Sequence, residues 1–290
     1  MNNKPNHPDS YQMVTERIIA KLKAGTIPWK HFASSPLGTP KSLVSKKPYH
    51  GINYFLLSAC SKYGSPYWLT FQQAQELGGH VRRGERSEIV VFWKFLKVED
   101  KQTGEKKEIP FLKYSHVFNL EQCEGLKLPP TAQGSSPRNS DPIKEAEAIV
   151  ENMPNRPRLE IDDVPSAYYS PAGDYVHMTA RERCVSDESF YSTLFHELSH
   201  STGHTSRLNR MNGDTAWHRF GSKPYANEEL VAEMGAAMLC AYAGIFQAIE
   251  ENSAAYIANW LVRLQNDKTL VVHAAAKAAK STGYILNEAG

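Results

Sequence analysis

The sequence His196-Glu197-Leu198-Ser199-His200 decides how the second half of this chain is interpreted, because it combines two imidazoles with a carboxylate. The surrounding residues 190–203 have a composition that predicts a helix. With about 3.6 residues per turn, positions i and i+4 lie on one face, so both imidazoles can bind one ion. We predict that His196 and His200 bind Zn²⁺, or another divalent metal, and that Glu197 takes a proton from the attacking water.

A third protein ligand is expected, because a catalytic zinc ion usually has three. One extended form of the motif, H-E-x-x-H-x-x-G-x-x-H, supplies a histidine three residues after a glycine. Gly203 occupies the glycine position, but Ser206 occupies the histidine position. His204 would lie about 12 Å along the helix from His196, which is too far to share one ion. This form of the motif is therefore disfavoured.

A second helix, predicted over residues 225–238, offers a better third ligand. Its small residues would let it pack closely on the first helix. Glu229 and Glu233 lie one turn apart on one face, the spacing with which zincins of the gluzincin type place a ligand and a following acidic residue. We assign Glu229 as the ligand and Glu233 as the acceptor for an imidazole N–H, with Glu233 as ligand the alternative. The neighbouring Glu228 is expected to face solvent.

Residues 167–178 predict a β-hairpin just before the metal-binding helix. Aromatic and β-branched side chains flank the turn signal Pro171-Ala-Gly-Asp174. A strand at the edge of a sheet can hold an extended peptide by main-chain hydrogen bonds. This hairpin is therefore a candidate site for a peptide substrate.

The chain of 290 residues is 41% hydrophobic and 22% charged, which is typical of a globular protein long enough for two domains. No apolar run approaches the length of a membrane span, and the polar residues 1–10 lack the apolar core of a signal peptide. The four cysteines are widely spaced and form no C-x-x-C pair. We therefore expect a cytoplasmic protein with reduced thiols and no membrane partner.

The small net charge of +2 hides an asymmetry between the two halves of the chain. Residues 1–128 carry 19 lysines and arginines against 11 acidic residues, a net charge of +8, whereas the remainder carries −6. Between the halves, residues 129–142 have the proline, glycine and serine content of a linker. We predict one domain over residues 1–128 that meets a polyanion, and a second over residues 143–290.

The first half mixes helices and strands without regular alternation. Apolar periodicity predicts helices over residues 10–24 and 70–77, and β-branched and aromatic runs predict strands over residues 87–97 and 111–118. This mixture favours an α+β domain, followed by a mainly helical metal-binding domain with a small sheet. Phe92 and Trp93 lie inside an apolar strand, so we expect both in the core.

Basic and aromatic side chains alternate in two stretches of the first half, residues 46–54 and 82–86. Cations that follow phosphates, with rings that stack on bases, are the combination with which proteins bind single-stranded nucleic acid. The candidate DNA-binding residues are Lys46, Lys47, Tyr49, Tyr54, Arg82, Arg83 and Arg86.

Several motifs resemble a known family. Gly25-Thr-Ile-Pro-Trp29, Tyr49-His-Gly-Ile-Asn53 and Val117-Phe-Asn-Leu-Glu-Gln122 resemble the N-terminal domain of the ArdC antirestriction proteins. The box at residues 196–200 and Asn227-Glu-Glu-Leu-Val-Ala-Glu-Met234 resemble the zincin-like metallopeptidase domain that accompanies it. The resemblance implies a plasmid-encoded protein that binds single-stranded DNA and protects conjugated DNA from the recipient's restriction enzymes.

The sequence is compatible with two functions. The protein is either a zinc metallopeptidase recruited or regulated by single-stranded DNA, with a protein substrate such as a restriction-system component, or a DNA-coating protein whose metal site is structural or vestigial. Glu197 favours the first, because a structural site needs no base. Two histidines and one glutamate also leave an open coordination position, which structural sites usually lack.

Overall fold

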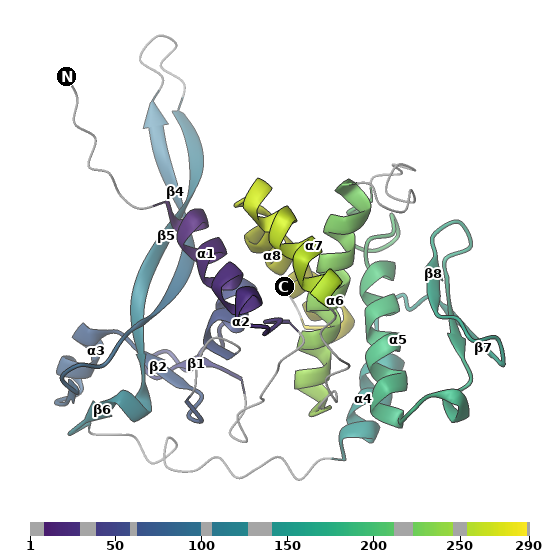
Figure 1. The fold of residues 1–290 in the computed structure, drawn as a ribbon, viewed down its shortest axis with the longest axis horizontal. Helices are drawn as coiled ribbons and strands as arrows, with labels where there is room; N and C mark the ends of the chain where they lie inside the picture. Colours follow the sequence, from purple (N-terminus) through teal and green to yellow (C-terminus); the bar gives the residue numbers. More distant parts are fainter. Residues whose placement is uncertain are drawn as a thin grey trace.

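The computed structural model describes residues 9–29, 39–58, 63–99, 106–126, 141–211, 223–245 and 254–288. Helices and strands are mixed, which confirms the predicted α+β class (Figure 1). The predicted linker lies outside the described residues except for Asp141 and Pro142, and so does Cys60. The thiols of Cys123, Cys184 and Cys240 are free.

The N-terminal half contains α1 (Ser10–Lys23), α2 (Ile52–Ser58), α3 (Phe71–Glu76) and a short helical turn, η1 (Leu120–Gln122). Its main sheet has the order β1 (Lys41–Ser42), β2 (Tyr67–Leu69), β5 (Lys106–Asn119) and β4 (Glu88–Glu99), and β3 (His80–Val81) pairs separately with β6 (Cys123–Glu124). The predicted helices and strands are thus present, with their ends shifted by a few residues. The antiparallel β4–β5 hairpin projects well beyond the helices (Figure 1).

The C-terminal half begins with α4 (Pro142–Asn152), followed by β7 (Arg158–Asp162), β8 (Tyr168–Ser170), β9 (Tyr175–Thr179) and the turn η3 (Arg181–Arg183). Then come α5 (Asp187–Ser201), α6 (Lys223–Ala243), α7 (Ala254–Asn266) and α8 (Leu270–Ile285). Strands β8 and β9 pair antiparallel, as predicted for residues 167–178, and β7 pairs parallel with β9. This sheet and α6 lie on opposite sides of α5 (Figure 1).

Helix starts are fixed by side chains that satisfy free backbone N–H groups. Asp9 caps α1, Asp141 caps α4 and Ser186 caps α5, each accepting a hydrogen bond from an amide in the first turn. At α3, Thr70 and Gln73 form a reciprocal capping box. These local signals explain why the helix starts follow the sequence closely.

The largest hydrophobic core joins the two halves of the sequence. Val14 and Ile18 of α1 belong to the same buried cluster as Met234 of α6 and Val271 of α8. A hydrogen bond from the Thr15 hydroxyl to the Lys268 carbonyl, 2.7 Å long, adds a polar link. A second core unites α4, α5, the small sheet and the far ends of α6 and α8. The boundaries 1–128 and 143–290 stay a prediction, and the shared core means that a fragment ending at residue 128 would expose apolar surface.

Phe92 and Trp93 correct one expectation. Both were expected in the core, yet they are 44% and 41% exposed. The physical reason is the alternation of side chains along a strand. Phe92 lies on the hairpin face that points away from the helices, whereas Trp93 lies on the opposite face and contacts the rings of Tyr11 and His273 without being fully covered.

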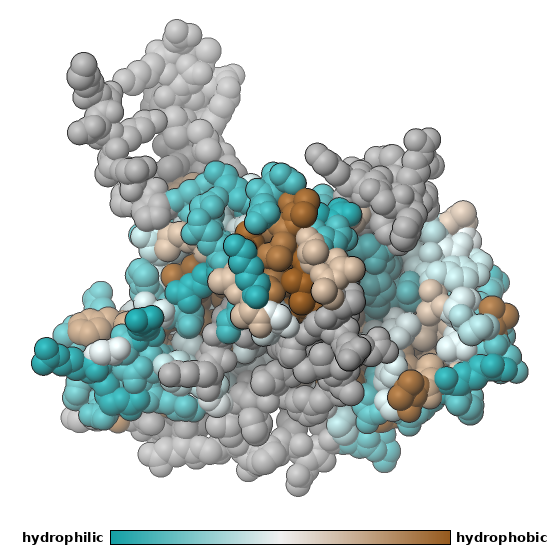
Figure 2. Space-filling model, in the orientation of Figure 1, coloured by the Kyte–Doolittle hydropathy of each residue, from teal (hydrophilic) through white to brown (hydrophobic). Residues whose placement is uncertain are grey.

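The face shown in Figure 2 is mostly hydrophilic over its described residues, with an apolar patch where Figure 1 has α7 and α8. Val262 of α7 is one exposed apolar side chain of these helices. Among the described residues, no helix has the length and apolar character needed to span a bilayer.

Candidate metal centre and nucleic-acid interface

Helix α5 holds the H-E-x-x-H box in its last two turns. The acidic residues Asp187 and Glu188 in its first turn complement the helix dipole. Phe195 and Leu198 point into the second core and are almost completely buried. Since these core residues alternate with the histidines at helical spacing, burying them orients His196 and His200 toward the neighbouring helix α6.

The three predicted ligands meet at one point. The Nε2 atoms of His196 and His200 are 3.1 Å apart. The Glu229 carboxylate oxygens lie 3.6 Å from the first nitrogen and 3.5 Å from the second. Ligands at about 2.0–2.1 Å from a tetrahedral zinc ion are separated by about 3.3 Å along each edge. The spacing of these atoms therefore fits a shared ion, and the other divalent metals that accept such ligands would suit it as well.

Close packing of α6 on α5 brings Glu229 within reach. A Cβ atom added at Gly235 would lie only 2.6 Å from the Ser199 hydroxyl oxygen and 3.1 Å from its Cβ atom, so even alanine would require Ser199 or the helix backbone to shift. The Ser199 hydroxyl itself donates to the Phe195 carbonyl within α5 and leaves no long side chain in the interface. The small residues noted in the sequence of α6 thus have the packing role expected of them.

Glu228 does not face solvent, which corrects a second expectation. Its carboxylate is buried and pairs with Arg210 at 2.5 Å. Arg210 also donates to the Ser199 carbonyl at 2.9 Å and to the Thr202 hydroxyl, so it ties α6 to the end of α5. Sequence reasoning missed this pair, because Arg210 lies in the irregular segment after α5 and no periodicity predicts its partner.

The second nitrogen of His200 faces Glu228. Nδ1 lies 3.9 Å from the nearer Glu228 oxygen, and it is a buried polar atom with no hydrogen-bond partner among the described residues. Burial opposes ionisation of Glu228, but neighbouring His200 and Arg210 keep the pKa of its carboxyl below the ordinary value. An ionised carboxylate is therefore available to orient this imidazole.

Glu233 has a different neighbour. Its carboxylate accepts a hydrogen bond from the Tyr256 hydroxyl, which in turn accepts one from the Trp29 indole at 3.1 Å. Burial, followed by the charge of Glu233, raises the pKa of Tyr256 above its ordinary value. The role of Glu233 as acceptor for an imidazole N–H stays a prediction. Its contact with Tyr256 connects the metal-site helix to the segment that follows α1.

The electrostatic environment favours a cation. Burial alone would lower the pKa of His196, but the nearby carboxylates of Glu229, Glu197 and Glu233 raise it above its ordinary value. The same negative potential that stabilises a protonated imidazole attracts a divalent ion. Glu197 is itself buried, next in sequence to the first ligand.

The residues predicted to bind DNA are divided between core and surface. Lys46, Lys47, Arg83 and Arg86 are exposed, and Arg82 forms an ion pair with Glu85 at 2.7 Å. Tyr49 is half-buried and packs on the cluster around Trp68. Tyr54 is only 6% exposed, and burial raises the pKa of its hydroxyl above the ordinary range. Because α2 turns this ring into the core, Tyr54 cannot stack on a base in this conformation.

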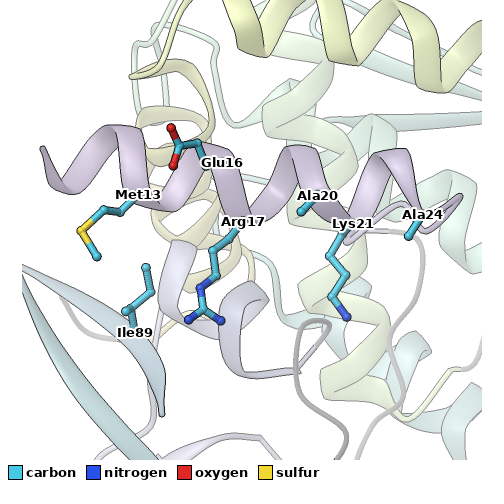
Figure 3. A pocket seen from close by; sticks show the side chains of 7 residues that line it. All are labelled: Met13, Glu16, Arg17, Ala20, Lys21, Ala24 and Ile89. Atoms are coloured by element: carbon cyan, nitrogen blue, oxygen red, sulfur yellow. The ribbon is translucent and has the colours of Figure 1, made fainter. Parts of the chain in front are cut away.

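A separate cavity of about 620 Å³ runs along α1 (Figure 3). Arg17 and Lys21 point to the same side as Met13 and Ile89, whereas Glu16 points away. Arg17 is already paired with Glu88 at the base of β4. Its charge is therefore largely compensated, and the cavity is only weakly suited to phosphate.

Two family models match the chain. The N-terminal domain of anti-restriction factor ArdC matches residues 8–118, and a zincin-like metallopeptidase matches residues 144–277. The chain is 35% identical to an uncharacterized protein, y4eC, of Sinorhizobium fredii, over 96% of this chain and 91% of that protein. Two proteins of Escherichia coli named DNA primase TraC are 34% and 33% identical over 98% of this chain, but the chain spans only 27% and 20% of their length.

Solved structures agree with the family models. Crystal structures of antirestriction ArdC from the R388 plasmid align with 96% of this chain, one described as metal-free and one as Mn(II)-bound. The first is 39% identical with a TM-score of 0.75 over 96% of that chain, and the second 38% identical with a TM-score of 0.74 over 97%. The chain therefore belongs to the ArdC antirestriction family and has a zincin-like metallopeptidase domain in its C-terminal half.

Proposed function

We propose that this protein is an antirestriction factor that binds single-stranded DNA and hydrolyses peptide bonds at a zinc centre. The observation that carries the hydrolase part is the convergence of His196, His200 and Glu229, with the buried Glu197 beside the first ligand. The DNA part is supported by the net charge of +8 on residues 1–128 and by the matching N-terminal domain of ArdC. Together these activities would protect conjugated DNA entering a recipient cell.

The chemistry would be divided among residues of α5 and α6. His196, His200 and Glu229 would hold a divalent ion that, when bound, acidifies water and polarises a carbonyl group. Glu197 would accept the proton of the attacking water and return it to the leaving amine. The ionised Glu228 would keep His200 in one orientation through its Nδ1 atom.

The small sheet offers a place for a peptide. In the order β7–β9–β8, strand β8 lies at an edge, and both β8 and β9 pack on α5. Backbone groups along an edge strand can add an extended peptide by main-chain hydrogen bonds. We propose that a peptide lies along β8, next to the helix that holds the histidines.

Zinc is proposed over other metals because imidazole and carboxylate ligands with one open position are typical of catalytic zinc. The Mn(II)-bound structure of the R388 protein makes manganese the main alternative for this chain. Metal analysis of protein purified without added metal should give close to one equivalent of zinc. One equivalent of manganese with no zinc would contradict the choice of element but not the ligand set.

The second candidate function is DNA coating without hydrolysis, and the basic charge of the first half favours it. A mating assay distinguishes the two: unmodified DNA is transferred into a restricting recipient that makes wild-type protein or Glu197→Gln. Hydrolysis predicts that Glu197→Gln loses protection although its metal content and its binding of oligothymidylate are unchanged. Equal protection by both proteins would contradict the hydrolase part and support coating.

A further inference from the structure

The outer face of the β4–β5 hairpin carries a regular pattern of rings and cations. Strand pairing sets Phe92 opposite Lys113, and Lys94 opposite Phe111. Since side chains alternate between the two faces of a strand, these four residues share one face. Phe92 is 44% exposed, both lysines are exposed and Phe111 is half-buried. Rings and cations thus occupy alternate corners of a small square.

The other face of the same hairpin is the one that packs on the helices. Val91 and Leu112 belong to the core with α1, and the ring of Trp93 contacts those of Tyr11 and His273. At the base of the outer face, Val90 is covered by the cluster around Trp68. Beyond that cluster Phe92, Lys94 and Lys113 are exposed and Phe111 is half-buried, so this part of the outer face is accessible to a ligand.

The charge of this face suits a polyanion. Neither lysine has an acidic cross-strand partner, because each lies opposite a phenylalanine. The nearest acidic residue of the same strand face, Glu88, is two positions before Val90 and is paired with Arg17. Exposed rings flanked by cations bind unstacked bases and their phosphates, whereas a closed duplex hides the faces of its bases.

We propose that Phe92, Lys94, Phe111 and Lys113, together called the hairpin platform, bind single-stranded DNA. This inference rests on the proposed DNA-binding function and assigns it a surface. Diagonal side chains on paired strands lie about 7–8 Å apart, so the two rings can each take one base while the lysines meet the phosphates. The platform has an exposed ring in Phe92, whereas the two tyrosines proposed for residues 46–54 are buried (Tyr54) and half-buried (Tyr49).

The test uses the full-length protein and a fluorescent oligothymidylate. Phe92→Ala should weaken binding by about 5- to 150-fold, the range for loss of one base-stacking ring. Phe92→Tyr keeps a flat ring and should bind within about threefold of wild type. Phe71→Ala removes a ring that is 50% exposed away from the platform, and should bind as wild type does. Circular dichroism of all variants checks the fold.

The lysines give an independent readout. Lys94→Ala with Lys113→Ala should reduce the slope of log affinity against log salt by about 1.4, because each phosphate contact on a single strand contributes about 0.7. Phe92→Ala should leave that slope unchanged, since stacking releases no counterions. Lys21→Ala, in the α1 cavity, should change neither slope nor affinity beyond twofold.

The results of these experiments distinguish an error in the proposed binding surface from an error in the proposed DNA-binding function. If wild type binds oligothymidylate and folded Phe92→Ala binds equally well, the platform is wrong while DNA binding stands. A loss confined to Trp93→Ala would assign the DNA to the opposite face of the hairpin and also overturn the proposal. If wild type itself does not bind, the proposed DNA-binding function fails.

Discussion

The metal centre and the hairpin platform differ in how their residues are brought together. At the metal centre, the two histidines are four residues apart on one helix, and the third ligand is on the helix packed against it. At the platform, residues more than fifteen positions apart meet through strand pairing. These residues can bind DNA only because their side chains are accessible. The comparison teaches that short-range spacing can be interpreted from a motif, whereas surface exposure requires the complete fold.

The largest effect is expected at Glu197. Glu197→Gln should lower peptidase activity by about 10²- to 10⁴-fold, because the amide keeps the shape but cannot accept the proton. Metal content and thermal stability should match those of wild type. Cleavage at the wild-type rate would show that Glu197 is not the base, and would weaken the claim that the motif alone reveals the chemistry.

The ligand assignment is tested by a matched pair on one helix face. Glu229→Ala should weaken metal binding by more than about 100-fold, since it removes a ligand rather than a group that only orients one. Glu233→Ala should retain most of the affinity, because the ligand atoms that converge belong to His196, His200 and Glu229, whereas the Glu233 carboxylate accepts a hydrogen bond from the Tyr256 hydroxyl. Competition with a chelator measures both affinities. The reverse ranking would make Glu233 the ligand.

Glu228 provides a further test of the metal centre, because its position beside His200 was not predicted from the sequence. Glu228→Gln should weaken metal binding by about 10- to 100-fold through looser orientation of His200. Asn227→Ala, the preceding and exposed position, is the control and should bind metal normally. A second variant, Arg210→Lys, separates the orientation of His200 from general destabilisation of the fold. It retains the positive charge beside Glu228, so it should weaken metal binding less than Glu228→Gln does. Unchanged affinity in folded Glu228→Gln would remove Glu228 from the site.

A stability effect is expected at the turn of the β8–β9 hairpin. Asp174 there forms an ion pair with Arg207, whose side chain is almost completely buried. Asp174→Asn should lower the free energy of unfolding by about 2 kcal/mol, less than the 3–5 kcal/mol typical of a fully buried pair, because Asp174 is a third exposed. Urea denaturation at neutral pH measures it. A change below about 0.5 kcal/mol, which is the usual scatter of surface mutations, would contradict the prediction.

The same pair has a defined pH dependence. Burial opposes ionisation of Asp174, but Arg207 and the Tyr169 hydroxyl lower its pKa below the ordinary value. A carboxyl with a lowered folded pKa stabilises the protein fully above its unfolded pKa, about 3.9, and this stabilisation is lost as pH falls through the folded pKa. The stability difference between wild type and Asp174→Asn should therefore be constant near neutrality and shrink below about pH 4.

The smallest effect concerns the basic residues singled out from the sequence. Arg83→Ala with Arg86→Ala should reduce the salt slope of oligothymidylate binding by no more than about 1.4, with affinity at low salt less affected than by Phe92→Ala. Both guanidinium groups are exposed, but no exposed ring accompanies them within residues 82–86. A larger loss here than for Phe92→Ala would favour the sequence-based surface over the hairpin platform.

The sequence predicted helices and strands better than it predicted the burial of individual side chains. The helix at residues 10–24, the strands at 87–97 and 111–118, and the hairpin at 167–178 all appear, because caps, turns and apolar periodicity act within a few residues. Glu228, Phe92 and Trp93 were assigned to the wrong environment. The burial of Glu228 depends on its ion pair with Arg210, eighteen positions earlier. The exposure of the two aromatic residues depends on which face of the hairpin the helices cover and how completely they cover it.

By itself, the sequence determined the H-E-x-x-H box, the two acidic positions on the next helix, the α+β class and the basic character of the first half. Each of these follows from residue type and short spacing, which the helical and strand repeats convert directly into geometry. Only the tertiary structure decided that Glu229 meets both imidazoles, that Tyr54 is buried, and that α1 shares a core with α6 and α8. Those facts depend on which surfaces pack together, and packing is a property of the whole chain.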